Sequence, residues 1–284
     1  MTYILFDIGG SKMRVVASKN LKKFEGEPII EPTKQDYDEG LAQLARLIEE
    51  ASGGGAITAI AGGIAGRFDE KGESLAGAPH LKDWIGKPFV SDLQGEFSVD
   101  VIATNDTGAA GLGEAHFGAG VDSQNMAYIT VSTGVGGKQI VDGKLDLHQR
   151  AEPGKQIIDF DETSCSDCEG VTLEHLIGGA ATEKRRGKKP FHIKKEAFWE
   201  DYAEKLAAGL HNIVRLWSPD TIVLGGSMII GDPAIPLPQV RSHLRKTLSK
   251  TVEVPALREA KLGDLGGLYG AMKLVEQELE QKKK

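Results

Sequence analysis

An Asn-Asp pair at residues 105 and 106 follows the apolar run Val101–Thr104. Such a run is typical of a buried β-strand, so the pair is expected at the end of a strand. At that position Asp106 could accept a proton from a hydroxyl group, and the Asn105 amide offers both a hydrogen-bond donor and an acceptor. Asn and Asp also dominate turns and helix starts, so the pair taken alone favours a turn.

Two glycine-rich segments, Asp7–Lys12 and Ser132–Gly137, each follow another strand-like run. Glycine lets the backbone turn sharply and bring successive N–H groups close to phosphate oxygens. The glycines concerned are Gly9, Gly10, Gly134, Gly136 and Gly137. One such segment would usually be a plain hairpin, but two of them together with Asn105-Asp106 predict the transfer of a phosphoryl group to an alcohol.

Length and charge limit this interpretation. The 284 residues exceed the size at which one core usually stops growing, which predicts two domains. The net charge of -7 argues against a general nucleic-acid binder. No apolar run is long enough to span a bilayer, and a charge at Asp7 interrupts the first apolar stretch too early for a signal peptide. These features predict a cytoplasmic enzyme with no membrane or nucleic-acid partner.

Strand-like and helix-like segments alternate along the chain, which indicates an α/β fold. Apolar residues at helical spacing predict helices around residues 41–48, 203–217 and 268–279, the second ending before Ser218-Pro219. The first glycine turn separates two strands and predicts a hairpin, and the same pattern restarts at Ala127. The two halves of the chain are therefore expected to be related. Strands are expected at 3–6, 13–18, 56–62, 99–104, 127–131, 138–141 and 221–224.

With these motifs in hand, the chain resembles the ROK family of bacterial sugar kinases and sugar-responsive repressors. The resemblance runs from the first strand to the last helix, and five segments carry it in the family's order. They are Asp7–Lys12, Gly66 with Gly77–Trp84, Asn105-Asp106 leading into Gly113–Gly120, Ser132–Gly137, and Ser218–Gly226.

The resemblance implies the two-domain actin-like ATPase fold, with ribonuclease H-like α/β domains and a ligand cleft between them. The first domain would comprise residues 1–115 with 268–284 and hold the sugar side, and the second, 116–267, would hold the nucleotide side. The family likeness also implies ATP and Mg²⁺ as cofactors and a homodimer as the assembly.

Carried over position by position, the resemblance makes Asp106 the general base that accepts the proton of the attacking sugar hydroxyl. Asp7 would hold Mg²⁺ through water. The sugar would contact Asn105, Glu152, Glu174, Lys155, His80 and Gly66. The nucleotide would contact Gly9, Gly10, Ser11, Lys12, Thr133, Gly134, Gly136, Gly137, Gly225 and Gly226.

The sequence departs from the family pattern on the presumed sugar side. Lys155 replaces a histidine of the family's structural zinc motif, and Cys165 and Cys168 do not restore its spacing, so a zinc-free variant is expected. A regrouped site using these cysteines with His148 and His175 stays open. His80 stands in place of an asparagine and Arg67 in place of a proline. With Lys155, these cationic side chains would suit a sugar with an acidic substituent.

Two other classes of function stay open. A catalytically silent sugar sensor or structural subunit would fit the altered sugar side, although Asp106 and both glycine segments argue against it. A kinase acting on a non-hexose polyol or an acidic metabolite would keep the chemistry and change the acceptor. A repressor of this family would need a DNA-binding domain ahead of Asp7, where the sequence has only six residues.

Overall fold

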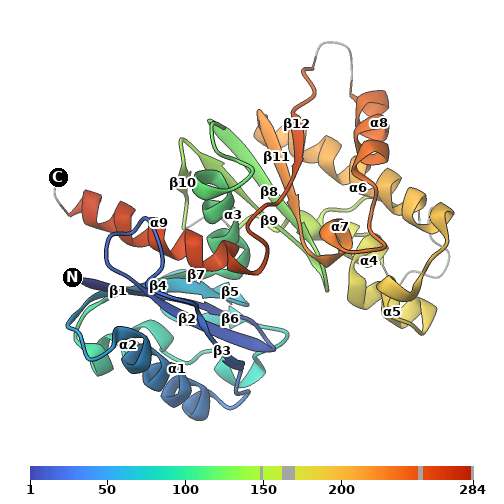
Figure 1. Ribbon diagram of the computed structural model, residues 1–284. Coiled ribbons are helices and arrows are strands. Elements are labelled where there is room, and N and C mark those ends of the chain that lie inside the picture. Colours follow the sequence, from blue (N-terminus) through green and yellow to red (C-terminus); the bar gives the residue numbers. More distant parts are fainter. Residues whose placement is uncertain (148–149, 162–169, 249–251, 283–284) are drawn as a thin grey trace. The chain divides into compact units, whose positions relative to one another are not determined.

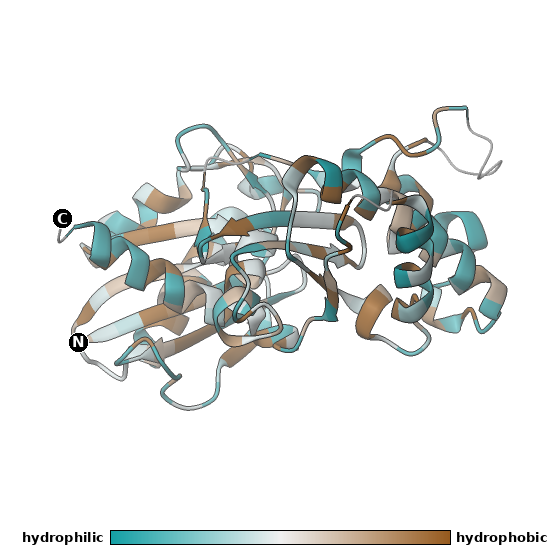
Figure 2. Cartoon of the chain, turned by 90° about the horizontal axis from the view of Figure 1, so that it is seen from above, coloured by the Kyte–Doolittle hydropathy of each residue, from teal (hydrophilic) through white to brown (hydrophobic). Residues whose placement is uncertain are grey.

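The computed structural model describes residues 1–147, 150–161, 170–248 and 252–282 (Figure 1). The chain divides into two compact units. Unit 1 comprises Met1–His116 and Asp264–Lys284, and unit 2 comprises Phe117–Gly263. The helix at the C-terminus carries both polar and apolar residues, which are seen as changing bands of teal and brown along it (Figure 2).

Unit 1 is built on a five-stranded sheet of order β3-β2-β1-β4-β7. Strand β1 pairs antiparallel with β2 and parallel with β4, and β4 pairs parallel with β7. Helices α1 and α2 lie on one side of the sheet and α3 and α9 on the other (Figure 1). The bounds are β1 Thr2–Ile8, β2 Lys12–Ser18, β3 Ile29–Pro32, α1 Tyr37–Ser52, β4 Ile57–Ile64, β5 Arg67–Phe68, β6 Leu75–Gly77, the 3-10 turn η1 Lys82–Trp84, α2 Phe89–Phe97, β7 Asp100–Asn105, α3 Asp106–Phe117, the 3-10 turn η4 Gly263–Leu265 and α9 Gly266–Gln281.

The core of unit 1 explains why its central strands are apolar on both faces. Ile4, Leu5 and Phe6 of β1 are fully buried because helices cover both sides of the sheet. Phe6 contacts Phe89 of α2 edge-on, with ring centroids 5.8 Å apart, and Trp84 packs 5.9 Å from the same Phe89 ring. Each large aromatic ring buried in this way removes 150–250 Å² or so from water. This cluster fixes η1 and α2 against the sheet.

Unit 2 has a second five-stranded sheet, of order β10-β9-β8-β11-β12. Its long helix α6 buries Ala203, Leu206 and Leu210 completely against the rest of the unit. The bounds are β8 Asn125–Val131, β9 Val135–Val141, β10 Lys144–Leu145, the 3-10 turn η2 Pro153–Lys155, α4 Leu173–Ile177, α5 Gly179–Arg186, the 3-10 turn η3 Pro190–His192, α6 Glu196–Trp217, β11 Thr221–Gly225, α7 Ser227–Ile230, α8 Leu237–Thr247 and β12 Ala256–Glu259.

The two sheets share one plan, as the repeated strand pattern predicts. In each, an antiparallel hairpin (β1–β2 or β8–β9) is extended by two parallel strands (β4 and β7, or β11 and β12). A helical segment precedes each parallel strand, and one further helix follows the last, α3 in the first half and α9 in the second. The relation between the halves is therefore confirmed at the level of strand order.

The predicted helices are present, but one glycine segment differs from expectation. The helix predicted to end before Ser218-Pro219 does end at Trp217. The turn expected over Ser132–Gly137 is shorter, because β9 begins at Val135 and pairs with β8 through Gly136 and Gly137. Within the described ranges, no helix is both long and apolar enough to cross a membrane.

Candidate active site

In unit 1 the strand register gathers polar side chains at one edge of the sheet. Asp7 of β1 lies beside Gly63 of β4, and Gly63 lies beside Thr104 of β7. These three strands are parallel, so their carboxyl ends meet at the same edge, where open α/β sheets bind their ligands. Asn105 and Asp106 follow directly at that edge, as the last residue of β7 and the first of α3.

Asp106 is a partly buried carboxylate at the start of α3. Its Oδ1 accepts hydrogen bonds from the Thr107 backbone N–H at 2.7 Å and from the Thr107 hydroxyl at 3.3 Å. Asn105 Oδ1 accepts from the Gly108 N–H at 2.9 Å and so caps the first turn of the helix. Burial raises the pKa of Asp106 above its ordinary value of 3.8, although Thr107 and the nearby His80 oppose the rise. A carboxyl group in this state binds a proton more readily than an exposed one.

Asp7 is the second partly buried carboxyl group at this edge, with its side chain 15% exposed. Arg14, directly opposite on β2, donates from Nη1 to Asp7 Oδ2 at 3.2 Å and from Nη2 to the exposed Asp264 at 2.9 Å. Burial raises the pKa of Asp7 to about 7, and Arg14 lowers it less than burial raises it. The backbone of Gly267 in α9 packs against the Asp7 carboxyl group so closely that a Cβ there would lie 2.8 Å from Asp7 Cγ.

The first glycine segment is packed tightly against the loop that carries His80. A Cβ on Gly10 would lie 2.3 Å from His80 Cβ, so only glycine fits. Gly66 lies against the same loop, since a Cβ there would come 2.9 Å from the Gly77 carbonyl oxygen. The structure thus brings together Gly10, His80 and Asp106, which the sequence analysis placed on the phosphate and sugar sides. Lys12 begins β2 and is exposed.

In unit 2 the second glycine segment forms the β8–β9 turn. The Ser132 N–H donates to the Gly134 carbonyl at 2.9 Å and closes the turn. The first residues of α5 hold it from outside, because the Gly179 and Ala180 N–H groups donate to the carbonyls of Ser132 and Thr133, both at 2.8 Å. The turn that contains Thr133 and Gly134 is therefore braced on its carbonyl side.

Glu174 of α4 ties this turn to η2. Its Oε2 accepts from the Val135 N–H at 2.9 Å, and its Oε1 accepts from Lys155 Nζ at 2.5 Å. Burial raises the pKa of Glu174, but the Lys155 ammonium and the Val135 N–H outweigh it and lower the pKa below its ordinary 4.5. Glu174 is therefore ionised at neutral pH, and the Lys155 charge that the sequence analysis assigned to a sugar substituent is already balanced by this carboxylate.

The other predicted residues of unit 2 lie on the same elements. Glu152 is exposed and directly precedes η2, and its carbonyl accepts from the Lys155 N–H at 2.9 Å. Gly225 ends β11, and Gly226, with φ +88°, leads into α7. Gly136 and Gly137 lie within β9, so they do not belong to the turn. Cys165, Cys168 and His148, the residues on which a zinc site depended, lie outside the described residues.

Two contacts at these edges were missed by the sequence analysis. Arg14 forms ion pairs with both Asp7 and Asp264. The register of the predicted β1–β2 hairpin places Arg14 opposite Asp7, so this contact could have been predicted from the sequence. The hydroxyl groups of Ser132 and Ser227 lie 3.1 Å apart, since β8 and β11 are adjacent parallel strands whose ends meet. No sequence signal marks this second pair, because it joins residues 95 positions apart.

Comparison with known protein families identifies the family to which the chain belongs. The model of the ROK family matches residues 3–278 of the chain. The chain belongs to the ROK family. Two ROK-type relatives align over nearly their whole length. An N-acetyl-D-glucosamine kinase from Histophilus somni is 28% identical, with 96% of this chain and 98% of that protein covered. A glucokinase from Pyrobaculum calidifontis is 29% identical, with 99% and 97% covered.

Solved ROK structures share the fold. A ROK hexokinase from Thermus thermophilus superposes with a TM-score of 0.81 at 24% identity, covering 99% of this chain and all of that one. A ROK glucokinase from Streptomyces griseus, solved with glucose and AMPPNP, gives 0.76 at 23% identity, covering 98% and 100%. The chain therefore has the two-domain actin-like ATPase fold of ROK hexokinases, as its motifs predicted.

Proposed function

We propose that this ROK protein is an ATP-dependent sugar kinase, which transfers the terminal phosphoryl group of ATP to a hydroxyl of a hexose or hexose derivative. The relatives named N-acetyl-D-glucosamine kinase and glucokinase cover almost the full chain, and the Streptomyces griseus glucokinase was solved with an ATP analogue and a sugar. Both classes of named acceptor are neutral sugars.

Asp106 carries the proposal as the general base. Its position at the carboxyl end of β7, its partial burial and its raised pKa suit a group that takes the proton from an attacking hydroxyl. Oδ1 already accepts from Thr107, and Oδ2 accepts no hydrogen bond from another described residue. Oδ2 is therefore the oxygen that we assign to the sugar hydroxyl, while Thr107 fixes the carboxyl group. Asn105 and His80 contact neighbouring sugar hydroxyls, with Gly66 giving the loop room.

Asp7 is suited to a magnesium ion that accompanies the nucleotide. Oδ2 is bound by Arg14, whereas Oδ1 accepts no hydrogen bond from a described residue, so it is open to a metal-bound water. No group of three or more His, Cys, Asp or Glu side chains in the described ranges could hold a metal by itself. Mg²⁺ usually rests on one or two carboxylates, together with waters and substrate phosphates. When bound, the ion would neutralise charge on the transferring phosphate.

The nucleotide is assigned to the glycine turns. In unit 1, the Gly9–Lys12 segment supplies N–H groups to phosphate oxygens, with Lys12 adding a positive charge. In unit 2, the Thr133–Gly134 turn does the same, and Gly225-Gly226 allows the adenosine to approach the backbone closely. Gly136 and Gly137 support this turn from within β9 instead of binding phosphate directly.

The sugar is further held by carboxylates of unit 2. Glu174 is kept ionised by Lys155 and still has lone pairs that can accept from sugar hydroxyls, and Glu152 lies on the adjoining turn. Because the Lys155–Glu174 pair is neutral overall, we propose a neutral hexose or N-acetylhexosamine as the acceptor, in place of an acidic sugar. A polar site of this kind rejects a wrong epimer strongly, since buried groups would be left unpaired.

A substrate panel tests the proposal. ATP-dependent ADP release is measured with glucose, mannose, N-acetylglucosamine, N-acetylmannosamine, glucuronate and a linear polyol. We expect one neutral sugar to give the highest kcat/KM. The absence of turnover with every sugar, combined with measurable sugar binding, would favour the silent sensor. A clear preference for glucuronate or the polyol would show that the proposed class of acceptor is wrong, while the proposed kinase reaction would stand.

A further inference from the structure

The loop that joins β3 to α1 donates hydrogen bonds to the carbonyl groups of the first glycine segment, Asp7–Lys12. The Thr33 hydroxyl donates to the Gly9 carbonyl at 2.7 Å, and Gln35 Nε2 donates to the Gly10 carbonyl at 2.9 Å. The Thr33 N–H completes the set by donating to the Ser11 carbonyl at 3.1 Å. Three successive carbonyl groups of the glycine segment are thus fixed by two residues more than twenty positions away in the sequence.

Fixing these carbonyls also fixes the N–H groups that follow them. In a planar trans peptide, the C=O of one residue and the N–H of the next point in opposite directions. With the Gly9 and Gly10 carbonyls turned toward Thr33 and Gln35, the N–H groups of Gly10 and Ser11 must turn away from them. Neither N–H finds an acceptor in the part of the chain that the structure describes. Two adjacent donors are therefore presented together on the outer side of the segment.

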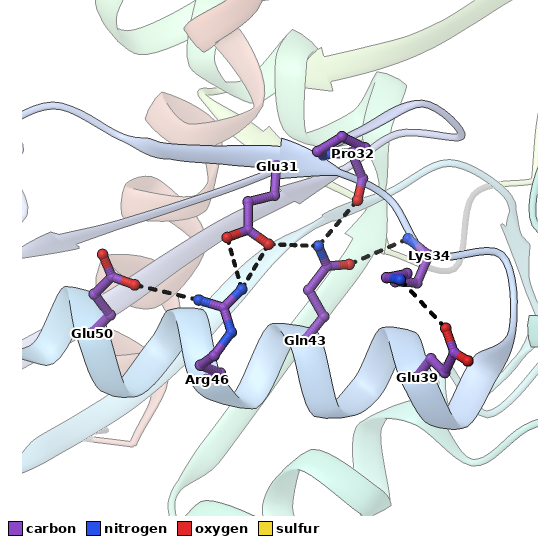
Figure 3. Close-up of polar contacts among 7 residues, drawn as sticks. All are labelled: Glu31, Pro32, Lys34, Glu39, Gln43, Arg46 and Glu50. Carbon is purple, nitrogen blue, oxygen red and sulfur yellow. Dashed lines mark hydrogen bonds and ion pairs between the residues drawn. The ribbon is translucent and has the colours of Figure 1, made fainter.

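Helix α1 in turn holds the β3–α1 loop in place through hydrogen bonds (Figure 3). Gln43 Oε1 accepts from the Lys34 N–H at 3.2 Å, while Gln43 Nε2 donates to the Pro32 carbonyl at 3.0 Å and to Glu31 at 2.8 Å. Arg46 then donates from Nη2 to both carboxylate oxygens of Glu31. Because Gln43 is 9% exposed and Thr33 8%, the bonds of these two residues are largely shielded from competing water, whereas the Arg46–Glu31 and Gln35–Gly10 bonds are exposed.

We propose that Thr33 and Gln35 are positioning residues for the nucleotide, which they orient by holding the Gly10 and Ser11 N–H groups toward a phosphate. The inference rests on the assignment of ATP to this segment made above. Without the two side chains the segment regains the freedom of about one residue, because the Thr33 N–H still holds the Ser11 carbonyl, and fixing one residue's backbone costs roughly 1–2 kcal/mol. In the variant, nucleotide binding would have to supply this free energy to order the backbone, so the affinity for the nucleotide falls by about 5- to 30-fold.

The test is the double variant T33V/Q35A, with AMPPNP-Mg²⁺ binding measured by calorimetry and both KM values measured in the kinase assay. We expect a weaker AMPPNP complex by about 5- to 30-fold and a matching rise in KM for ATP, with KM for the sugar unchanged. T33S, which keeps the hydroxyl, should bind AMPPNP like the wild type. S18A is the matched control, because the buried Ser18 hydroxyl also donates to a carbonyl, that of Lys23, but at the far end of β2.

Four outcomes would overturn the inference. It is wrong if the double variant binds AMPPNP like the wild type, if sugar affinity falls equally, if S18A gives the same loss, or if the wild type binds no adenine nucleotide. A wild type that binds AMPPNP and loses that affinity in T33V/Q35A, but phosphorylates no sugar, would instead refute the proposed kinase function alone.

Discussion

The buried carboxyl group of Asp7 should make unit 1 less stable as the pH rises through neutrality. Its pKa is about 7 in the folded chain against an ordinary 3.8, and its side chain is only 15% exposed. A group whose pKa is raised by folding stabilises the folded state below its unfolded pKa and loses this contribution as the pH passes the folded value. At 1.36 kcal/mol per pKa unit, the loss between pH 5 and pH 8 amounts to roughly 2–3 kcal/mol.

Asp7→Asn should remove this dependence. The free energy of unfolding is measured by urea titration at pH 5, 6, 7 and 8 in EDTA, so that no metal binds the carboxylate. Trp84 is the only tryptophan of unit 1, so Phe at Trp199 and Trp217 makes its fluorescence report on that unit. We expect D7N to gain roughly 2–3 kcal/mol on the wild type from pH 5 to pH 8.

Asp264→Asn is the control for this series. The Asp264 charge also raises the pKa of Asp7, but less than burial does, and the Asp264 side chain is 81% exposed, so its removal should leave most of the pH dependence in place. A difference between D7N and the wild type that stays constant across the four pH values would refute the reasoning, because it would mean that Asp7 is as well solvated in the folded state as in the unfolded one.

Two further substitutions test the contacts around the proposed site. Gly10→Ala would place a methyl group 2.3 Å from His80 Cβ, so we expect KM for ATP to rise at least roughly tenfold. Gly95→Ala in α2 is the control, because a Cβ there meets nothing within 4 Å, and it should leave KM for ATP unchanged. An equal rise in KM for both variants would contradict the close contact between Gly10 and His80. Lys155→Met should raise KM for the sugar severalfold while shifting the melting temperature by less than about 4 °C, because the lysine side chain is 55% exposed and such pairs add little stability. Lys205→Met, which breaks the Asp201 pair instead, should leave that KM unchanged.

The alternation of apolar and polar residues was sufficient to predict the main elements and their class. Runs such as Ile4–Phe6 are apolar because both faces of the strand are covered, and α6 ends where Ser218-Pro219 stops a helix. The position of Asp106 after a buried strand was likewise readable. The length of the second turn was not, since Gly136 and Gly137 could join the ladder with β8 at no cost visible in the sequence.

Apart from Arg14 opposite Asp7, the contacts that hold the candidate site in place were beyond sequence reasoning, because they depend on the pairing and packing of elements that are separated in the sequence. Thr33 meets Gly9 only after β3 has paired with β2. The Lys155–Glu174 pair arises because η2 and α4 converge, and it changes the meaning of Lys155 from a free cation to a neutralised one. The sugar-side and nucleotide-side roles, the domain limits at 115 and 267, and the homodimer stay predictions.

The turnover of Asp106→Asn with the best sugar of the panel tests the central claim most directly. The substitution keeps the shape of the side chain and removes its ability to take a proton, so we predict a fall in kcat of roughly 10²- to 10⁴-fold, with AMPPNP binding and folding retained. A kcat within a few-fold of the wild type would contradict the assignment of Asp106 as the general base.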